Sequence, residues 1–229
     1  MQALCLCLLS YAAATATATR ALDSAAIGAD GAAARSGSAP LPLLALCGSL
    51  RARSANCALA RAAAAASPAV ALAPRLDLPL FDADVEADGY PPAVALLREQ
   101  ARAAAGFVFA VPEYNAAPSG VFKNALDWLS RPGPEGASPI KGKPFIVLTA
   151  GGASGGARAQ RALQGMVADA GMTNAGAGAE PVAVKLFDGT ARYDAQGDYL
   201  ADPAVLALVA AQVRALEAAV QVAPPAAAA

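Results

Sequence analysis

The sequence predicts a doubly wound α/β domain, in which helices cover both faces of a parallel sheet. After residue 40, short and continuously apolar runs alternate with segments long enough to form helices. Continuous apolarity is typical of strands that are buried on both faces of a parallel sheet. The intervening segments are long enough to cross over from one strand to the next. These observations together predict five βα units in one layered domain.

Five strands and five helices are expected along the chain. The predicted strands are residues 43–47, 70–74, 106–111, 144–150 and 181–187, and the predicted helices are residues 54–66, 92–104, 119–130, 156–170 and 203–220. In such a fold ligands bind at the carboxyl ends of the strands. The loops that follow Cys47, Val111 and Ala150 are therefore the candidate sites.

Composition excludes several classes of function. The 229 residues carry a net charge of −1 and contain no histidine. Without histidine, Ser-His-Asp and Cys-His mechanisms and His-ligated metal sites are excluded within this chain, and no metal site is predicted. The absence of a basic excess argues against a nucleic-acid surface. Proton chemistry would depend on Lys, Tyr or a carboxylate, or a cofactor would supply the reaction.

Residues 1–40 are expected to be a targeting leader or a disordered extension. They include LCLCLLSYAAA (residues 4–14), which is too short to span a bilayer and resembles the apolar region of a signal peptide. The leader indicates secretory or organellar targeting of a soluble mature domain, without giving the destination. Residues 41–221 are the predicted domain, and residues 222–229 a disordered tail. No other segment is expected to span a membrane.

Four cysteines are present, with no CxxC spacing. Cys5 and Cys7 fall in the leader, Cys47 in a predicted strand and Cys57 in a predicted helix. The last two are expected to be reduced and mostly buried thiols.

The loop GSLRARSAN (residues 48–56) joins the first strand to the first helix. Gly48 allows a tight exit from the strand, and Ser54 is a good N-cap residue. Helix N-terminal N–H groups and the Arg51 guanidinium favour an anion. A dinucleotide loop has glycine where this one has Leu50 and Arg53, so a monophosphate is the predicted ligand. A solvated turn with two surface arginines is the alternative.

The loop after Val111 carries PEYN (residues 112–115). Tyr114 brings a flat ring with a polar tip, and Asn115 brings an amide that both donates and accepts. These groups suit the face and edge of a planar heterocycle. In the following helix, Trp128 is expected to be a core or interface residue.

The third loop contains Gly152, Ser154 and Gly156 in the pattern G-x-S-x-G, between a strand and a helix. This pattern is typical of a nucleophile elbow, but no histidine is present to activate the serine. Two interpretations remain: a glycine-rich loop whose backbone approaches a flat ligand, or a loop that is merely flexible.

In this order, the three loops resemble those of the NADPH-dependent FMN reductase family, over residues 43–220. That family includes flavin, quinone, azo and chromate reductases. The resemblance implies a flavodoxin-like fold with a five-stranded parallel sheet of order 2-1-3-4-5. It implies that the FMN phosphate is held by Ser49, Arg51, Ser54 and Asn56. It also implies that the flavin is lined by Pro112, Glu113, Tyr114 and Asn115, and closed off by Gly151, Gly152, Ser154, Gly155 and Gly156.

The resemblance further implies an FMN-dependent NAD(P)H oxidoreductase that passes hydride to the flavin and then electrons to a small-molecule acceptor such as quinone or flavin. The flavin carries the chemistry, so no catalytic side chain is assigned, and NADPH is not separated from NADH. A homodimer or homotetramer is implied, with residues 119–131 as a candidate interface. A flavodoxin-like electron carrier and a flavin-free regulatory or scaffold protein are the alternatives. Low net charge argues against the carrier, because carriers use strongly charged docking faces.

Overall fold

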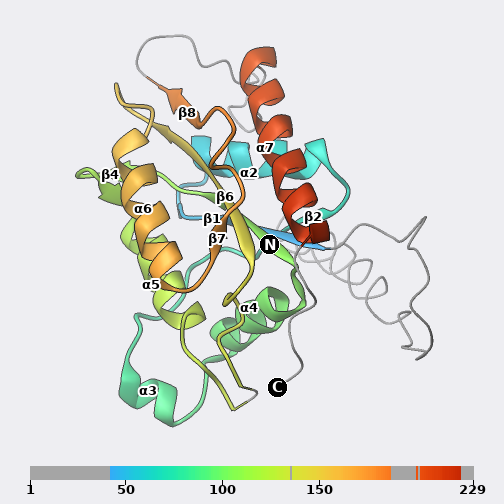
Figure 1. The fold of residues 1–229 in the computed structure, drawn as a ribbon. Helices are drawn as coiled ribbons and strands as arrows, with labels where there is room; N and C mark the ends of the chain where they lie inside the picture. The colour runs from blue at the N-terminus through green and yellow to red at the C-terminus, as the bar shows by residue number, and fades with distance from the viewer. Residues whose placement is uncertain (1–41, 135, 187–199, 201, 223–229) are drawn as a thin grey trace, which may run out of the picture. The chain divides into compact units, whose positions relative to one another are not determined.

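A parallel sheet forms the centre of the fold in this computed structural model, which describes residues 42–134, 136–186, 200 and 202–222 (Figure 1). The predicted leader, with Cys5 and Cys7, lies outside these residues, as does the predicted tail from residue 223 on. The first four strands stand in the order β2-β1-β3-β6, all parallel. They are β1 (Leu43–Cys47), β2 (Val70–Leu72), β3 (Gly106–Ala110) and β6 (Pro144–Gly151).

The last place in the sheet is divided between two short strands, β7 (Thr173–Asn174) and β8 (Val182–Lys185). β7 pairs with the start of β6, where Phe145 lies opposite Asn174, and β8 pairs with its end, where Leu148 lies opposite Val182. The flavodoxin-like class and the strand order are therefore confirmed. The predicted fifth strand at residues 181–187 corresponds to β8, whereas the two-residue strand β7 was not predicted; residues 175–181 leave the sheet between the two pairings.

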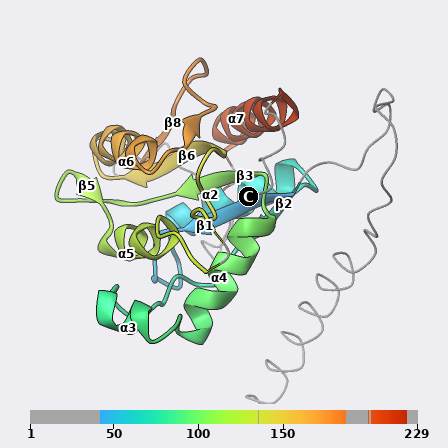
Figure 2. The same ribbon diagram turned by 60° about the horizontal axis from the view of Figure 1, so that its bottom comes forward.

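The helices cover both faces of the sheet. One face carries α2 (Ala55–Ala66) and α7 (Pro203–Val222); the other carries α4 (Pro92–Ala103), α5 (Gly120–Leu129) and α6 (Ala157–Asp169). Figure 2 shows α4 and α5 across the strands from α7. These five helices begin and end within two residues of the predicted bounds. The short helix α3 (Ala83–Ala87), which begins after the N-cap Asp82, was not predicted.

Two hydrophobic clusters explain why the strands are apolar throughout. Leu43 and Ala45 of β1 pack into the cluster beneath α2 and α7, whereas Leu44 and Leu46 pack into the cluster beneath α4, α5 and α6. Because successive side chains point to opposite faces, each strand needs apolar residues at every position.

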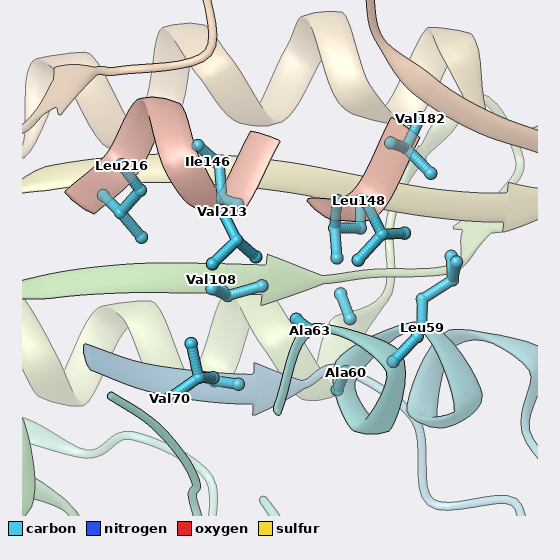
Figure 3. Packing of buried hydrophobic residues seen from close by; sticks show 14 of the residues in the cluster. Leu59, Ala60, Ala63, Val70, Val108, Ile146, Leu148, Val182, Val213 and Leu216 are labelled. Carbon is cyan, nitrogen blue, oxygen red and sulfur yellow. The ribbon is translucent and has the colours of Figure 1, made fainter. Parts of the chain in front are cut away.

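The helix α7 bears on the expectation that no segment after the leader spans a membrane. Over an 18-residue window its mean hydropathy is 1.6, so by length and composition it could cross a membrane. In this structure 28% of that window is buried, and the helix packs on the sheet by one face: Val213 and Leu216 are fully buried and belong to the same cluster as Val108 and Ile146 of the sheet (Figure 3).

The packing of α7 gives a test by substitution. Leu216→Ala should lower the free energy of unfolding by about 2–4 kcal/mol, because it leaves a cavity against the sheet. Leu206→Ala on the same helix is the matched control, since Leu206 is 36% exposed, and should change stability by less than about 1 kcal/mol. Urea unfolding followed by circular dichroism measures both. Equal effects would contradict the packing of α7 on the sheet.

Candidate functional site

Three loops meet at one edge of the sheet. Cys47 lies opposite Ala110 in the parallel register, and Ala110 lies opposite Leu148. β1 and β3 therefore end at the same level, and β6 continues three residues further, to Gly151, at the same edge of the sheet. We call the loops that follow these strands the phosphate loop (48–54), after the ligand that the sequence predicts for it, the hairpin (113–118) and the glycine loop (151–156). As the sequence predicts, the three loops lie at the carboxyl edge of the sheet.

The phosphate loop presents an arginine to solvent beside a helix start. The Ser49 hydroxyl is buried and accepts a hydrogen bond from the backbone N–H of Arg51 at 3.3 Å. The Arg51 side chain is exposed, and no carboxylate in the described part of the chain forms an ion pair with it. Ser54 is the N-cap of α2 and accepts from Cys57 N–H. The first N–H groups of α2 lie beside these side chains and favour an anion.

Asn56 joins the first turn of α2 to the end of β6. Its buried Nδ2 donates to the carbonyl of Ala150, and its Oδ1 accepts from the N–H of Ala150, both at 2.9 Å. These two hydrogen bonds satisfy both the N–H and the carbonyl of Ala150, and they connect α2 to a strand that is distant in sequence. The side chain therefore positions the phosphate loop against the glycine loop, a role that the sequence did not indicate.

Ser119 joins the phosphate loop to α5. Its hydroxyl donates to the carbonyl of Gly48 at 2.6 Å and accepts from the N–H of Phe122 at 3.2 Å, as the N-cap of α5. A Cβ on Gly48 would lie 3.0 Å from the Cβ of Phe122. The sequence predicts the start of this helix at Ser119 but gives no signal for its long-range contact.

The hairpin has a two-residue turn at its tip. Its strands are β4 (Glu113–Tyr114) and β5 (Ala117–Pro118), and the turn residues Asn115 and Ala116 have φ angles of 52° and 63°. Two positive φ angles are what a type I′ hairpin turn requires; asparagine tolerates this conformation better than alanine does. Tyr114 is 50% exposed at the tip. Pro112, in contrast, is buried where the chain leaves β3.

Glu113 fixes the hairpin to the start of α6. Its carboxylate accepts from Arg158 Nη2 at 2.6 Å, from Ser154 Oγ at 3.1 Å, and from the N–H groups of Arg158 and Ala159 at 3.0 and 3.3 Å. The N-cap residue of α6, Gly156, has no side chain to cap the helix. Glu113 therefore supplies the cap from another loop, and the negative charge stabilises the helix N-terminus.

The environment of Glu113 determines its protonation. Burial by itself raises the pKa of the carboxyl, and its side chain is only 6% exposed. The hydrogen bonds from Arg158, Ala159 and Ser154 act in the opposite direction and outweigh burial, so the pKa lies below its usual 4.5. Glu113 is therefore ionised at neutral pH and remains bound to α6 rather than turned toward a ligand.

The glycine loop is explained by packing within the protein. Gly155 and Gly156 have φ angles of 63° and 92°. A Cβ on Gly155 would overlap the carbonyl of Ala183, and one on Gly156 would lie 2.6 Å from the Cβ of Thr149. Close approach of the chain to itself therefore requires both glycines. Ser154 donates to Glu113, so its hydroxyl serves as a link between loops.

A disulfide spans the phosphate loop. Cys47, the last residue of β1, is bonded to Cys57 in the first turn of α2, with their Cα atoms 5.1 Å apart. The expectation of two reduced and mostly buried thiols is therefore wrong, and both residues are only half-buried. The cause is the return of the chain at Gly48, which brings the helix start back beside the strand end.

The apolar face of α5, the candidate interface, is occupied by the core of its own chain. Trp128 is fully buried, and its indole N–H donates to the carbonyl of Pro79 at 2.9 Å, so it is a core residue. Lys123 and Asp127, an ion pair one turn apart, lie at the surface of the helix. A partner would meet these charges rather than the apolar face.

Cavity size does not indicate this site. A cavity of about 640 Å³ lies near the C-terminal ends of α5 and α6 and is lined by residues such as Leu126, Asp127, Met166 and Asp169. The three loops adjoin the opposite ends of these helices. The convergence of strand ends, rather than the volume of a cavity, identifies the candidate site.

Residues 41–185 match the family described as NADPH-dependent FMN reductase, a range that contains all three loops. The chain belongs to that family. This FMN reductase family member is 50% identical over 97 residues to an NAD(P)H-dependent FMN reductase of Pseudomonas aeruginosa. The aligned residues are 42% of this chain and 51% of the relative. It is 46% identical over 96 residues to a quinone reductase of Escherichia coli, covering 41% and 50%.

The chain spans about half the length of these curated relatives. Over a longer stretch it resembles the solved structure of FerB, a flavoenzyme NAD(P)H:(acceptor) oxidoreductase from Paracoccus denitrificans. That match has a TM-score of 0.66 and 26% identity, and covers 80% of this chain and 98% of FerB. A WrbA-like flavodoxin from Agrobacterium tumefaciens, at 14% identity and a TM-score of 0.53, shares the fold.

The role of Glu113 can be tested by Glu113→Gln. The variant should lose about 1–3 kcal/mol of stability at pH 7, because the charged cap and the Arg158 pair are weakened. Because the folded-state pKa is below 4.5, this contribution is complete above the unfolded pKa and is lost as pH falls through the folded value. The difference between wild type and variant should therefore shrink below about pH 4.5. Denaturant unfolding at several pH values measures it.

Glu99→Gln is the matched control, since Glu99 is an exposed carboxylate on α4. It should leave stability nearly unchanged at every pH. A Glu113→Gln difference that stays constant down to pH 3 would contradict the proposed cap, since ionised Glu113 would then contribute nothing.

Proposed function

We propose that residues 41–221 form an FMN-dependent NAD(P)H oxidoreductase domain that reduces a quinone, a flavin or a similar small acceptor. The observation that carries this proposal is the convergence of the phosphate loop and the hairpin at one edge of the sheet, within the range matched to the family. One loop offers anion donors and the other an exposed aromatic ring. FMN joins a phosphate to a flat ring, so one ligand would use both.

The donor set of the phosphate loop fits a single terminal phosphate. Arg51 supplies a charged donor, Ser49 and Ser54 supply hydroxyl groups, and α2 supplies N–H groups at its start. A hydrogen bond to a charged group contributes about 1.5–3 kcal/mol, more than a neutral one. Leu50 and Arg53 fill the places where a pyrophosphate would need glycine. We propose that Asn56 holds the loop in place through its hydrogen bonds to Ala150. Its second amide hydrogen would then donate to the phosphate.

The hairpin and the glycine loop fit the ring end of FMN. Tyr114 offers its exposed ring and Asn115 its amide, at the tip of a turn with two positive φ angles. Glu113 holds this tip against Ser154 in the glycine loop. We propose that Gly151, Gly152 and Ser154 to Gly156 close the ring from that side through their backbone. Pro112 would position the hairpin indirectly, because it is buried where the chain leaves β3 and restricts the backbone there.

FMN, when bound, supplies hydride acceptance from NAD(P)H and onward transfer of electrons to the acceptor. The chain needs only to bind and orient the reactants, because hydride transfer depends on proximity and stacking more than on a side-chain acid or base. The absence of histidine from the chain is consistent with a reaction in which the flavin, and not a side chain, supplies the chemistry. The names of the relatives, an FMN reductase, quinone reductases and an NAD(P)H:(acceptor) oxidoreductase, support the same reaction class.

Reconstitution with FMN tests this function. The purified full chain should bind FMN and oxidise NADPH or NADH in the presence of a quinone. Stopped-flow mixing with NAD(P)H should bleach the bound flavin within the turnover time. Slow bleaching combined with rapid electron exchange would favour the electron carrier instead. A protein that binds no FMN would rule out both.

The role of Arg51 gives a second test. Arg51→Ala should raise the Kd for FMN at least about tenfold, since it removes the charged donor for the phosphate. Arg53→Ala, in the same loop and likewise exposed, is the matched control and should change the Kd by less than about threefold. Quenching of FMN fluorescence measures both constants. Equal constants for wild type and Arg51→Ala would remove Arg51 from the phosphate site.

We also propose that the chain acts as a homodimer or homotetramer. The half-exposed Tyr114 beside the ring end would then lie near a subunit boundary, as the family resemblance implies. Light scattering of the purified protein gives the number of subunits.

A further inference from the structure

We propose that the Cys47–Cys57 pair is a redox modification site that controls how tightly the phosphate loop holds FMN. This inference rests on the proposed function, because it concerns the same loop. Oxidised, the pair clamps the end of β1 to the first turn of α2. Reduced by a dithiol, it releases the clamp and weakens the binding of the FMN phosphate.

The disulfide lies directly beside the residues that would bind phosphate. The sulfur atoms of Cys47 and Cys57 are 3.8 and 3.6 Å from the carbonyl oxygen of Ser49. Between the two cysteines stand Ser49, Arg51, Ser54 and Asn56, all in one nine-residue segment. Cys57 is also the residue whose N–H is bonded to the N-cap Ser54. Opening the disulfide therefore removes one restraint on the segment that carries the anion donors.

The pair is accessible to a reductant. Both cysteines are half-buried, and both line a cavity of about 160 Å³ together with residues such as Leu72, Pro74 and Arg75. Arg75 carries a guanidinium with a 65% exposed side chain at this cavity. Arg75 is paired with Asp77 at 4.0 Å, so this cavity provides access to the disulfide rather than a free positive charge.

Reduction would loosen the loop without unfolding the domain. Gly48 remains bonded to β3 through its N–H and the carbonyl of Ala110, and to Ser119 through its own carbonyl. Asn56 remains bonded to Ala150. The core clusters contain both β1 and α2 independently of the disulfide. The disulfide is thus an additional restraint on a loop that hydrogen bonds already hold at both ends. Its reduction should therefore weaken FMN binding without abolishing it.

The exchange balances as a two-electron step. A thiolate of the dithiol attacks one sulfur of the pair, breaking the Cys47–Cys57 bond and forming a mixed disulfide. The second thiol of the reductant then closes its own disulfide and releases the remaining cysteine. Two electrons and two protons pass to the protein, Cys47 and Cys57 end as thiols, and the dithiol ends as a disulfide.

FMN affinity in the two states tests the proposal. The full chain with Cys5→Ser and Cys7→Ser keeps Cys47 and Cys57 as its only cysteines. Alkylation and mass spectrometry should count no free thiol before dithiothreitol and two after it. The Kd for FMN, from fluorescence quenching of the apoprotein, should rise about 5- to 10-fold on reduction and recover on reoxidation with oxidised glutathione.

Cys57→Ser in the same background is the matched variant. It should bind FMN like the reduced parent and should not respond to dithiothreitol. If it fails to fold by circular dichroism, the reduced parent itself still gives the decisive Kd. Equal Kd values in the two states of the parent would overturn the clamp while leaving the FMN site intact. Two free thiols that resist oxidation would also overturn it. No FMN binding in either state would overturn both the clamp and the proposed function.

Discussion

The parallel register of β1, β3 and β6 is the constraint on which the rest of the structure depends. Backbone hydrogen bonds fix Cys47, Ala110 and Leu148 at the same level, so β1 and β3 end side by side and β6 ends three residues beyond them, at the same edge of the sheet. A slip of one residue in any of these strands would exchange the side chains of that strand between the two core clusters. The apolar cores on both sides of the sheet therefore protect the alignment of the site.

Polar contacts then fix the loops relative to one another. Asn56 binds the backbone of Ala150, Ser119 binds the carbonyl of Gly48, and Glu113 binds the start of α6. Each contact joins two segments that are distant in sequence and uses a side chain that is buried or nearly so. An unpaired polar group at such a position would be costly, so these contacts favour one arrangement of the site. Asn56, Glu113 and Ser154, which the family resemblance assigns to FMN, thus connect one segment of the site to another in this structure.

The main elements could be predicted because their signals are local. Continuous apolar runs predicted the five strand regions, the N-cap residue Ser54 predicted the start of α2, and the helical pattern predicted the start of α5 at Ser119. The small hairpin and the division between β7 and β8 could not be predicted. Asn115 carries a turn signal, but Ala116 adopts a positive φ that its residue type does not favour. Two-residue strands also carry too few side chains to produce a periodic pattern.

The sequence by itself determined the fold class, the order of the loops and the absence of histidine chemistry, because these follow from residue type and local pattern. Only the tertiary structure decided what individual site residues do. It joined Cys47 to Cys57, turned Glu113 toward Arg158 and paired Asn56 with Ala150. Such pairings depend on the distance between atoms that the chain brings together only when the sheet has formed. Neither spacing nor composition can specify that distance in advance.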